Sequence, residues 1–201
     1  MSDLIPAIAE HLAVTAAGVG IAVLIGIPLG ILIAKKPGFA APVLTVADVI
    51  QTIPSLALLA ILMILFGLGD TTVVIGLFLY SLLPVIRNTY TGISGVSPSI
   101  REAARGMGMN VFQSLARVEI PLSLPMIFSG IRIAFVTALG TAVIGVLIGA
   151  GGLGGVIYGG IQAQDWGMIW EGTIPVMALS LLAQFLFNRL QNRFQKGRKK
   201  N

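Results

Sequence analysis

The chain alternates long apolar stretches with short polar ones, and the apolar stretches have the length of membrane-crossing helices. Residues 12–34 contain no charged side chain, and about 20 apolar residues suffice for one crossing. Further stretches cover residues 43–68, 71–86, 122–148 and 174–187, the last being short by strict counting. The pattern predicts an all-α, polytopic membrane protein with five transmembrane helices, in which residues 1–201 form a single transmembrane domain.

One longer polar segment, residues 97–121, separates the third predicted span from the fourth. Ser99 and Glu102 have the spacing of a capping box, which predicts a short helix from about residue 100 to the glycines that follow. Asn110, with Gln113 in the supporting position, is expected to cap a second short helix. The segment is therefore predicted to form a helix–turn–helix on one face of the membrane.

Composition and charge support this interpretation and predict the orientation. Charged residues make up only 10% of the chain, whereas about a quarter is usual in soluble proteins. Basic residues follow the first, third and fifth spans, and the opposite side receives only acidic ones, namely Asp3, Glu10, Asp70, Asp165 and Glu171. Because basic residues collect on the cytoplasmic side, we expect the N-terminus outside and the C-terminus inside.

The C-terminal tail is basic enough to suggest nucleic acid as a partner. Its basic residues are Arg189, Arg193, Lys196, Arg198, Lys199 and Lys200. A basic run that directly follows a final span is typical of a stop-transfer signal and of contact with anionic lipid. The sequence therefore predicts contact with the lipid bilayer and no nucleic-acid partner.

The polar segment also carries a spaced motif: Glu102-Ala103-Ala104, then Gly108, then Val118 and finally Ile120-Pro121. This spacing resembles the EAA loop of ABC importer permeases, with Val and Ile where Ile and Leu are commoner. In that family the loop forms coupling helices that dock on the ATP-binding subunit. The candidate ATPase-coupling residues are accordingly Arg101, Glu102, Ala103, Ala104, Arg105, Gly108, Ile120 and Pro121.

Three charged residues of this motif have more than one interpretation. Arg101 and Arg105 lie four residues apart and so share one helix face, which suits acidic residues on a partner. A solvated face or a face toward lipid headgroups is the alternative. Glu102 can act as a helix cap, as a partner contact, or as both.

The resemblance extends over roughly residues 10–190 and is greatest to the permeases of osmoprotectant importers. The runs that carry it are 51–57, 83–90, 118–121 and 149–154. It implies a permease subunit of an ATP-driven, binding-protein-dependent importer for quaternary amines such as glycine betaine, choline or carnitine, located in the cell membrane. Permeases for amino acids and sulfonates share the architecture, so another small solute remains an alternative.

The resemblance also implies the partners. These are two ATPase subunits, a second permease subunit that is either identical or different, and an extracytoplasmic substrate-binding protein. ATP and Mg²⁺ would bind to the ATPase, since this chain has no G-x-x-x-x-G-K-[ST] motif, and no cofactor, metal or catalytic residue is expected here. An ion-coupled secondary transporter or channel is a weaker alternative, because it needs titratable groups within the membrane and often has inverted repeats. An intramembrane enzyme is weaker still.

Polar residues inside the predicted spans are candidates for the transport path. They are Asp48, Gln51, Thr52, Ser55, Arg132, Thr137 and Thr141. Asp48 and Arg132 are the charges well inside spans, and such residues are expected to face the bundle interior or a watery cavity. We hypothesise that they approach each other or their copies in a dimer. The alternative places Asp48 at the interface and extends Arg132 toward the headgroups.

Three further features suggest chemistry that the sequence does not support. The run 149–154 has the G-x-G-x-x-G spacing, but no strand–helix unit surrounds it, so its glycines are expected to allow a helix break and close packing. His11 is the only histidine and there is no cysteine, which excludes a multi-His or thiolate metal site. Trp166 and Trp170 are expected to anchor the chain at the outer membrane interface rather than to form a cage for a quaternary ammonium.

Overall fold

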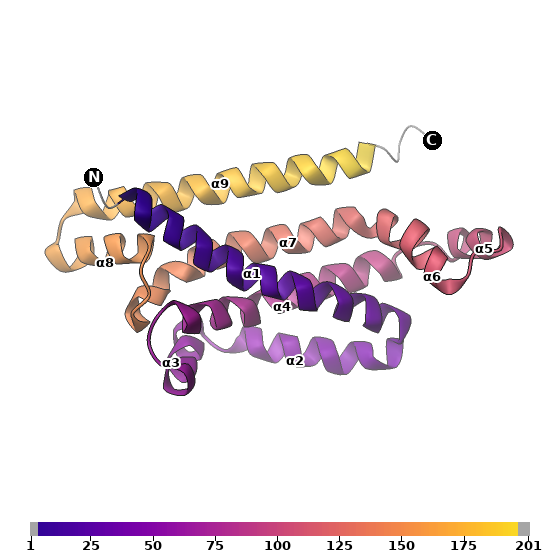
Figure 1. Ribbon diagram of the computed structural model, residues 1–201, viewed down its shortest axis with the longest axis horizontal. Coiled ribbons are helices and arrows are strands. Elements are labelled where there is room, and N and C mark those ends of the chain that lie inside the picture. The colour runs from indigo at the N-terminus through magenta and orange to yellow at the C-terminus, as the bar shows by residue number, and fades with distance from the viewer. Residues whose placement is uncertain (1–3, 197–201) are drawn as a thin grey trace.

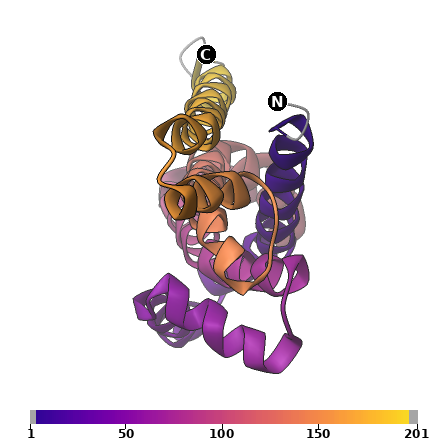
Figure 2. The same ribbon diagram turned by 90° about the vertical axis from the view of Figure 1, so that its left-hand side faces the viewer.

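The computed structural model describes residues 4–196, and this part of the chain is helical without any strand (Figure 1). Four long helices run along the molecule: α1 (Leu4–Lys35), α4 (Asp70–Ser94), α7 (Ile120–Ala142) and α9 (Trp166–Lys196). Helices α1, α4 and α7 pack against one another, and α9 packs against α7 (Figures 1 and 2). The predicted all-α class is confirmed.

Shorter helical segments connect the long ones. They are η1 (Pro37–Phe39), α2 (Ala40–Thr52), α3 (Ser55–Phe66), α5 (Pro98–Gly106), α6 (Val111–Ser114), the π-helical turn η2 (Leu115–Glu119), the 3₁₀ segment η3 (Val143–Ile148) and α8 (Leu153–Ala163). Figure 1 shows α5 and α6 at one end of the molecule and α8 at the other. Residues 198–200 of the basic tail lie outside the described residues.

Within the described residues, four stretches of helix are long and apolar enough to cross a membrane. They are Leu4–Lys35, Asp70–Ser94, Val111–Ile148 and Trp166–Phe194. A fifth candidate is the pair Pro37–Thr52 and Ser55–Phe66, whose halves are bent by 97°. The observed helices are longer than the predicted spans. The prediction ended each span at the first polar residues, whereas the helices continue through them.

The predicted second span, residues 43–68, is two helices rather than one. Pro54 has no N–H to donate and restricts Ile53 before it, whose backbone is extended with φ −68° and ψ 126°. Helix α4 holds the bend, because the Gln51 side chain donates to the Tyr80 carbonyl at 2.8 Å and the Tyr80 hydroxyl donates to the Ile53 carbonyl. The break is therefore fixed by contacts from another helix.

The α1–α4 interface depends on small residues. Gly18, Ala22, Gly26 and Gly30 recur every four residues on α1 and are all buried. A Cβ at Gly30 would lie 2.6 Å from the Thr89 Cβ of α4. Close approach of backbones through such small-residue stripes is a principal source of helix association in membranes.

The glycine-rich run 149–154 allows the chain to turn sharply between η3 and α8. Gly149 and Gly152 have positive φ angles of 80° and 77°, which favour glycine. The Gly152 N–H donates to the Glu10 carboxylate at 2.8 Å, so the turn lies directly against the beginning of α1. Next to Glu10, the buried His11 donates from Nε2 to the Leu139 carbonyl at 3.0 Å. These glycines therefore permit a helix break and close packing, as expected.

Candidate functional site

The predicted helix–turn–helix is formed by α5, α6 and η2, but α5 begins differently from the prediction. Its N-cap residue is Ser97, whose side chain makes no capping bond, and Pro98 occupies the first turn. Ser99 therefore lies within the helix, where it cannot cap it, and its hydroxyl is 2.7 Å from that of Ser97. The predicted Ser99–Glu102 capping box is wrong, and Glu102 is exposed.

The turn that ends α5 is a Schellman motif. The Met109 N–H donates to the Ala104 carbonyl at 3.1 Å, and the Gly108 N–H donates to the Arg105 carbonyl at 2.9 Å. Gly108 has φ +81°, a left-handed conformation that glycine adopts without strain. Two carbonyls at the end of the helix are thereby satisfied, and the direction of the chain after α5 is fixed.

Helix α6 begins at the capping box that the spacing predicts. The Asn110 side chain accepts from the Gln113 N–H at 2.8 Å, and the Gln113 side chain accepts from the Asn110 N–H at 3.0 Å. Only four residues separate this cap from η2, in which the hydrogen bonding shifts to π-helical. Pro121 follows at the start of α7 and donates no backbone hydrogen bond.

The candidate coupling residues divide into an exposed and a buried set. Glu102, Ala103, Arg105, Gly108 and Pro121 are exposed, whereas Ile120 and Arg101 are partly buried and Ala104 is only 1% exposed. Ala104 thus faces the rest of the chain, whereas Glu102, Ala103 and Arg105 form the outer surface of α5. This surface is open to a partner along its whole length.

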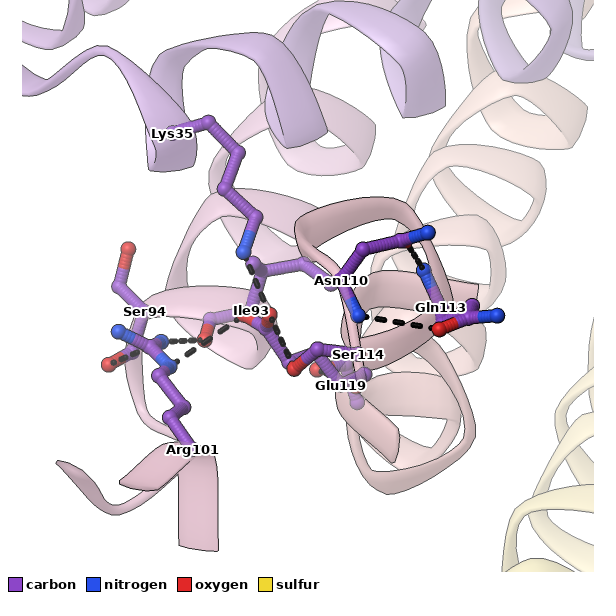
Figure 3. A network of polar contacts seen from close by, with 9 residues as sticks. Lys35, Ile93, Ser94, Arg101, Asn110, Gln113, Ser114 and Glu119 are labelled. Carbon is purple, nitrogen blue, oxygen red and sulfur yellow. Dashed lines mark hydrogen bonds and ion pairs between the residues drawn. The ribbon is translucent and has the colours of Figure 1, made fainter. Parts of the chain in front are cut away.

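Glu119 is buried at the centre of a polar network that we call the Glu119 cluster: Lys35, Arg101, Ser114 and Glu119 (Figure 3). Its carboxylate lies 2.5 Å from the Lys35 Nζ and 3.3 Å from the Arg101 Nε. Arg101 also donates to the Ile93 carbonyl at 2.6 Å, near the end of α4. The cluster therefore joins the C-terminal ends of α1 and α4 to α5 and η2.

A cavity of about 590 Å³ adjoins this cluster. It is lined by Ala34, Lys35, Arg101, Arg105, Met109, Asn110, Val111, Ser114 and Glu119. Arg101 and Arg105 do share one side, as their spacing predicts, and that side faces the cavity. The acidic partner of Arg101 is Glu119 of the same chain, whereas Arg105 forms no ion pair with any described residue.

A second cavity, of about 290 Å³, lies between α2, α4 and α7, and we call it the Gln51 cavity. Its lining includes Gln51, Tyr80, Asn88, Thr137 and Thr141. Three of the predicted path residues, Gln51, Thr137 and Thr141, are thus brought together from distant parts of the chain. Its other lining residues are Ser81, Leu83, Pro84, Arg87, Ile133, Ala134 and Ala138.

Two predicted path residues, Thr52 and Ser55, lie outside this cavity at the bend between α2 and α3. The Thr52 hydroxyl donates to the Val49 carbonyl at 2.7 Å, within its own helix. Ser55 is the first residue of α3 and is partly buried. Thr52 and Ser55 therefore lie at the break between α2 and α3 and do not line the Gln51 cavity.

The hypothesis that Asp48 approaches Arg132 is wrong within this chain. The Asp48 carboxylate accepts two hydrogen bonds from Arg87 of α4, at 2.6 and 2.7 Å. Arg132 instead donates to the Asn188 side chain of α9 and lines a different cavity. The two residues have different partners because α4 is the neighbour of α2, whereas Arg132 is on the face of α7 that meets α9.

We expect the stability of charge-reversed variants to follow these observed pairs. Asp48→Arg places two cations side by side and should lower the melting temperature of the purified protein, and adding Arg87→Asp should restore most of the loss. Because both side chains are nearly half exposed, the pair is expected to contribute about 0–1 kcal/mol. Adding Arg132→Asp to Asp48→Arg should restore nothing, and recovery in that variant would contradict the observed pairing.

Sequence reasoning missed the partners that hold these residues in place. Glu119 lies in the polar segment 97–121, but its burial has no local signal, since its partner Lys35 is 84 positions away. Arg87 directly follows the predicted span 71–86, although α4 continues to Ser94. Tyr80 occupies an apolar run and gives no sign that it contacts the Pro54 bend.

Comparison with protein families gives one match that covers most of the chain. The family described as "Binding-protein-dependent transport system inner membrane component" matches residues 26–200. Among curated proteins, the carnitine transport permease protein OpuCD of Listeria monocytogenes is 48% identical over 88% of this chain and 80% of its own length. The osmoprotectant import permease protein OsmW of Salmonella typhimurium is 44% identical over 90% and 87%. The glycine betaine/carnitine/choline permease OpuCD of Bacillus subtilis is 45% identical over 95% and 84%.

Solved structures share the fold. A chain of the MetNI methionine ABC transporter, determined in inward-facing conformations, superimposes with a TM-score of 0.85 and covers 96% of this chain and 97% of its own length. Its sequence is 23% identical. An amino acid ABC transporter superimposes with a TM-score of 0.64 at 25% identity, over 98% and 96% of the two chains. The helix arrangement described above is thus that of ABC transporter membrane subunits.

Proposed function

The chain belongs to the family of binding-protein-dependent transport system inner membrane components, and from this premise we propose that it imports quaternary-amine osmoprotectants such as glycine betaine, choline or carnitine. As a member of that family it is a multi-pass permease subunit of the inner membrane. The observation that carries the substrate class is 44–48% identity, over most of the chain, to permeases named for these solutes.

The proposed docking surface for the ATPase is the exposed side of α5 together with the turn at Gly108. Figure 1 shows this segment at one end of the molecule, beyond the ends of the long helices. The exposed side chains of Glu102 and Arg105 form no ion pair with any described residue. Because this short segment projects from the bundle, it is well placed to bind a separate ATPase subunit. ATP and Mg²⁺ would then bind to that subunit, which is expected in two copies.

The proposed transport path runs along the Gln51 cavity. Gln51 and Thr137 are exposed on the cavity's open side, so this chain alone does not enclose it. A second permease, identical or different, would complete the walls. The hydroxyl and amide groups in its lining, among them Asn88, Thr137 and Thr141, can exchange hydrogen bonds with a hydrated solute, while high-affinity selection would belong to an extracytoplasmic binding protein.

The proposed orientation places α5 and the C-terminus in the cytoplasm. Lys35 and Arg101 lie together at that end of the bundle, joined through Glu119. At the opposite end, Glu10 and Asp70 accept hydrogen bonds from the turn that contains Gly152. This separation of basic and acidic ends follows the distribution expected across a bacterial inner membrane.

Uptake by the purified transporter tests the proposal. The permease would be reconstituted in proteoliposomes with its ATPase and binding protein, and uptake of radiolabelled glycine betaine, choline and carnitine would be measured with and without internal ATP. ATP-dependent uptake of at least one quaternary amine is expected, in excess over methionine, histidine and taurine. Uptake of methionine, histidine or taurine alone would overturn the substrate class. Uptake without the ATPase would overturn the transporter class.

A further inference from the structure

We propose that Glu119 is a positioning residue through which displacement of α5 reaches α1 and α4 in the membrane. The proposal rests on the function proposed above, in which an ATPase moves α5. It adds a specific route through this chain: from Arg101 on α5, through the Glu119 carboxylate, to Lys35 at the end of α1. The motif residues on the outer face of α5 do not account for this route.

The first argument is the placement of the charge. Glu119 is 2% exposed, which is rare for a carboxylate unless it is paired. Its two oxygens face cations from different elements, with Oε1 2.5 Å from Lys35 and Oε2 3.3 Å from Arg101. A single buried anion thus holds together two segments that are far apart in sequence, as Figure 3 shows.

The second argument is how rigidly Glu119 itself is held. It ends the π-helical turn η2, and its carbonyl accepts a hydrogen bond at 2.7 Å from the buried Ser123 hydroxyl of α7. Single π-helical turns occur frequently at functional sites, because the additional residue changes the direction of the following side chains. Glu119 is therefore attached to the start of α7 and belongs to a different helix from Arg101 of α5.

The third argument is that α5 has few other links to the membrane helices. Its backbone packs chiefly against α6 and η2. Arg101 provides the polar connection, since one guanidinium group reaches both Glu119 and the Ile93 carbonyl at the end of α4. If these contacts are preserved when α5 shifts, the ends of α1 and α4 must move with it. If the contacts break, α5 can shift without moving α1 or α4.

Glu119→Gln tests the proposal because it removes the charge and preserves the shape. In proteoliposomes with the ATPase and binding protein, we would measure ATP hydrolysis and osmoprotectant uptake on the same sample. The ATPase should still co-purify, since the outer face of α5 is unchanged, but uptake per ATP hydrolysed should fall roughly 5- to 150-fold, the usual range for loss of an allosteric coupling. An unchanged ratio of uptake to hydrolysis would overturn the proposal.

Lys35 and Lys36 provide a matched pair of further variants. Lys35 contacts Glu119, whereas its exposed neighbour Lys36 forms no ion pair among the described residues. Lys35→Gln should lower uptake per ATP and Lys36→Gln should not; equal effects would contradict the route. If Glu119→Gln does not accumulate in the membrane, the Lys35 and Lys36 variants decide the question alone, because the Lys35 side chain is partly exposed and its replacement is expected to disturb folding less.

The experiment distinguishes failure of the Glu119 proposal from failure of the proposed transport function. If the unmodified protein shows no ATP-dependent uptake of a quaternary amine, the substrate proposal fails before any variant is compared. If Glu119→Gln loses the ATPase on purification, Glu119 maintains the docking surface and does not transmit its movement. The proposal requires retained ATPase, continued hydrolysis and reduced uptake in one preparation.

Discussion

Gly30→Leu is expected to prevent α1 from packing on α4, whereas Gly20→Leu in the same helix should be tolerated. A Cβ at Gly30 would lie 2.6 Å from the Thr89 Cβ and 2.9 Å from the Ile86 carbonyl oxygen. Neither group can move far, since Thr89 and Ile86 are themselves buried in α4. Overpacking costs roughly 1–3 kcal/mol in a well-packed core, and leucine adds further carbons where Cβ alone already clashes.

Gly20 is the matched control because nothing lies within 4 Å of a Cβ at that position. Both substitutions remove one helical glycine and gain the same helix propensity, about 1 kcal/mol. The measurement is the amount of monodisperse protein after extraction in detergent, together with its melting temperature. For Gly30→Leu we expect a decrease of about 2–4 °C for each kcal/mol lost. Equal behaviour of the two variants would show that the glycine stripe does not determine the interface.

Much of the fold could be predicted from the sequence because hydropathy is a local property. Residues 12–34 and 71–86 are apolar whatever surrounds them, and the structure places α1 and α4 over them. The cap at Asn110 and the turn at Gly108 could also be predicted, since each depends on residues at most a few positions apart. Local chemistry thus indicates the positions of these helices and of some of their ends, but the failed cap at Ser99 shows that it does not determine every end.

The pairing of side chains could not be predicted, because it depends on which helices become neighbours. Arg132 meets Asn188, 56 positions later, and the Gly152 N–H meets Glu10 across 142 positions. The bend at Pro54 shows the same limit. The proline is visible in the sequence, but the direction of α3 after it is fixed by Tyr80, whose hydroxyl contacts Ile53 from α4.

Gly108→Val is expected to release the ATPase from the permease, while Gly106→Val should retain it. Gly108 has φ +81° in the turn after α5, and left-handed backbone costs residues other than glycine roughly 1–2 kcal/mol. The cost is greater for a β-branched residue such as valine. Since 1–2 kcal/mol corresponds to a factor of about 5–30 in population, the turn would rarely adopt the conformation that presents α5.

Gly106 offers the control, because it ends α5 without a positive φ and a Cβ there would meet nothing within 4 Å. The measurement is the amount of ATPase that co-purifies with a tagged permease, normalised to the permease recovered. A clash within this chain cannot explain a difference, since a Cβ at Gly108 is also free of contacts within 4 Å. A loss confined to Gly108→Val would therefore assign the effect to the backbone of the turn, whereas full retention in both variants would place the docking surface elsewhere on the chain.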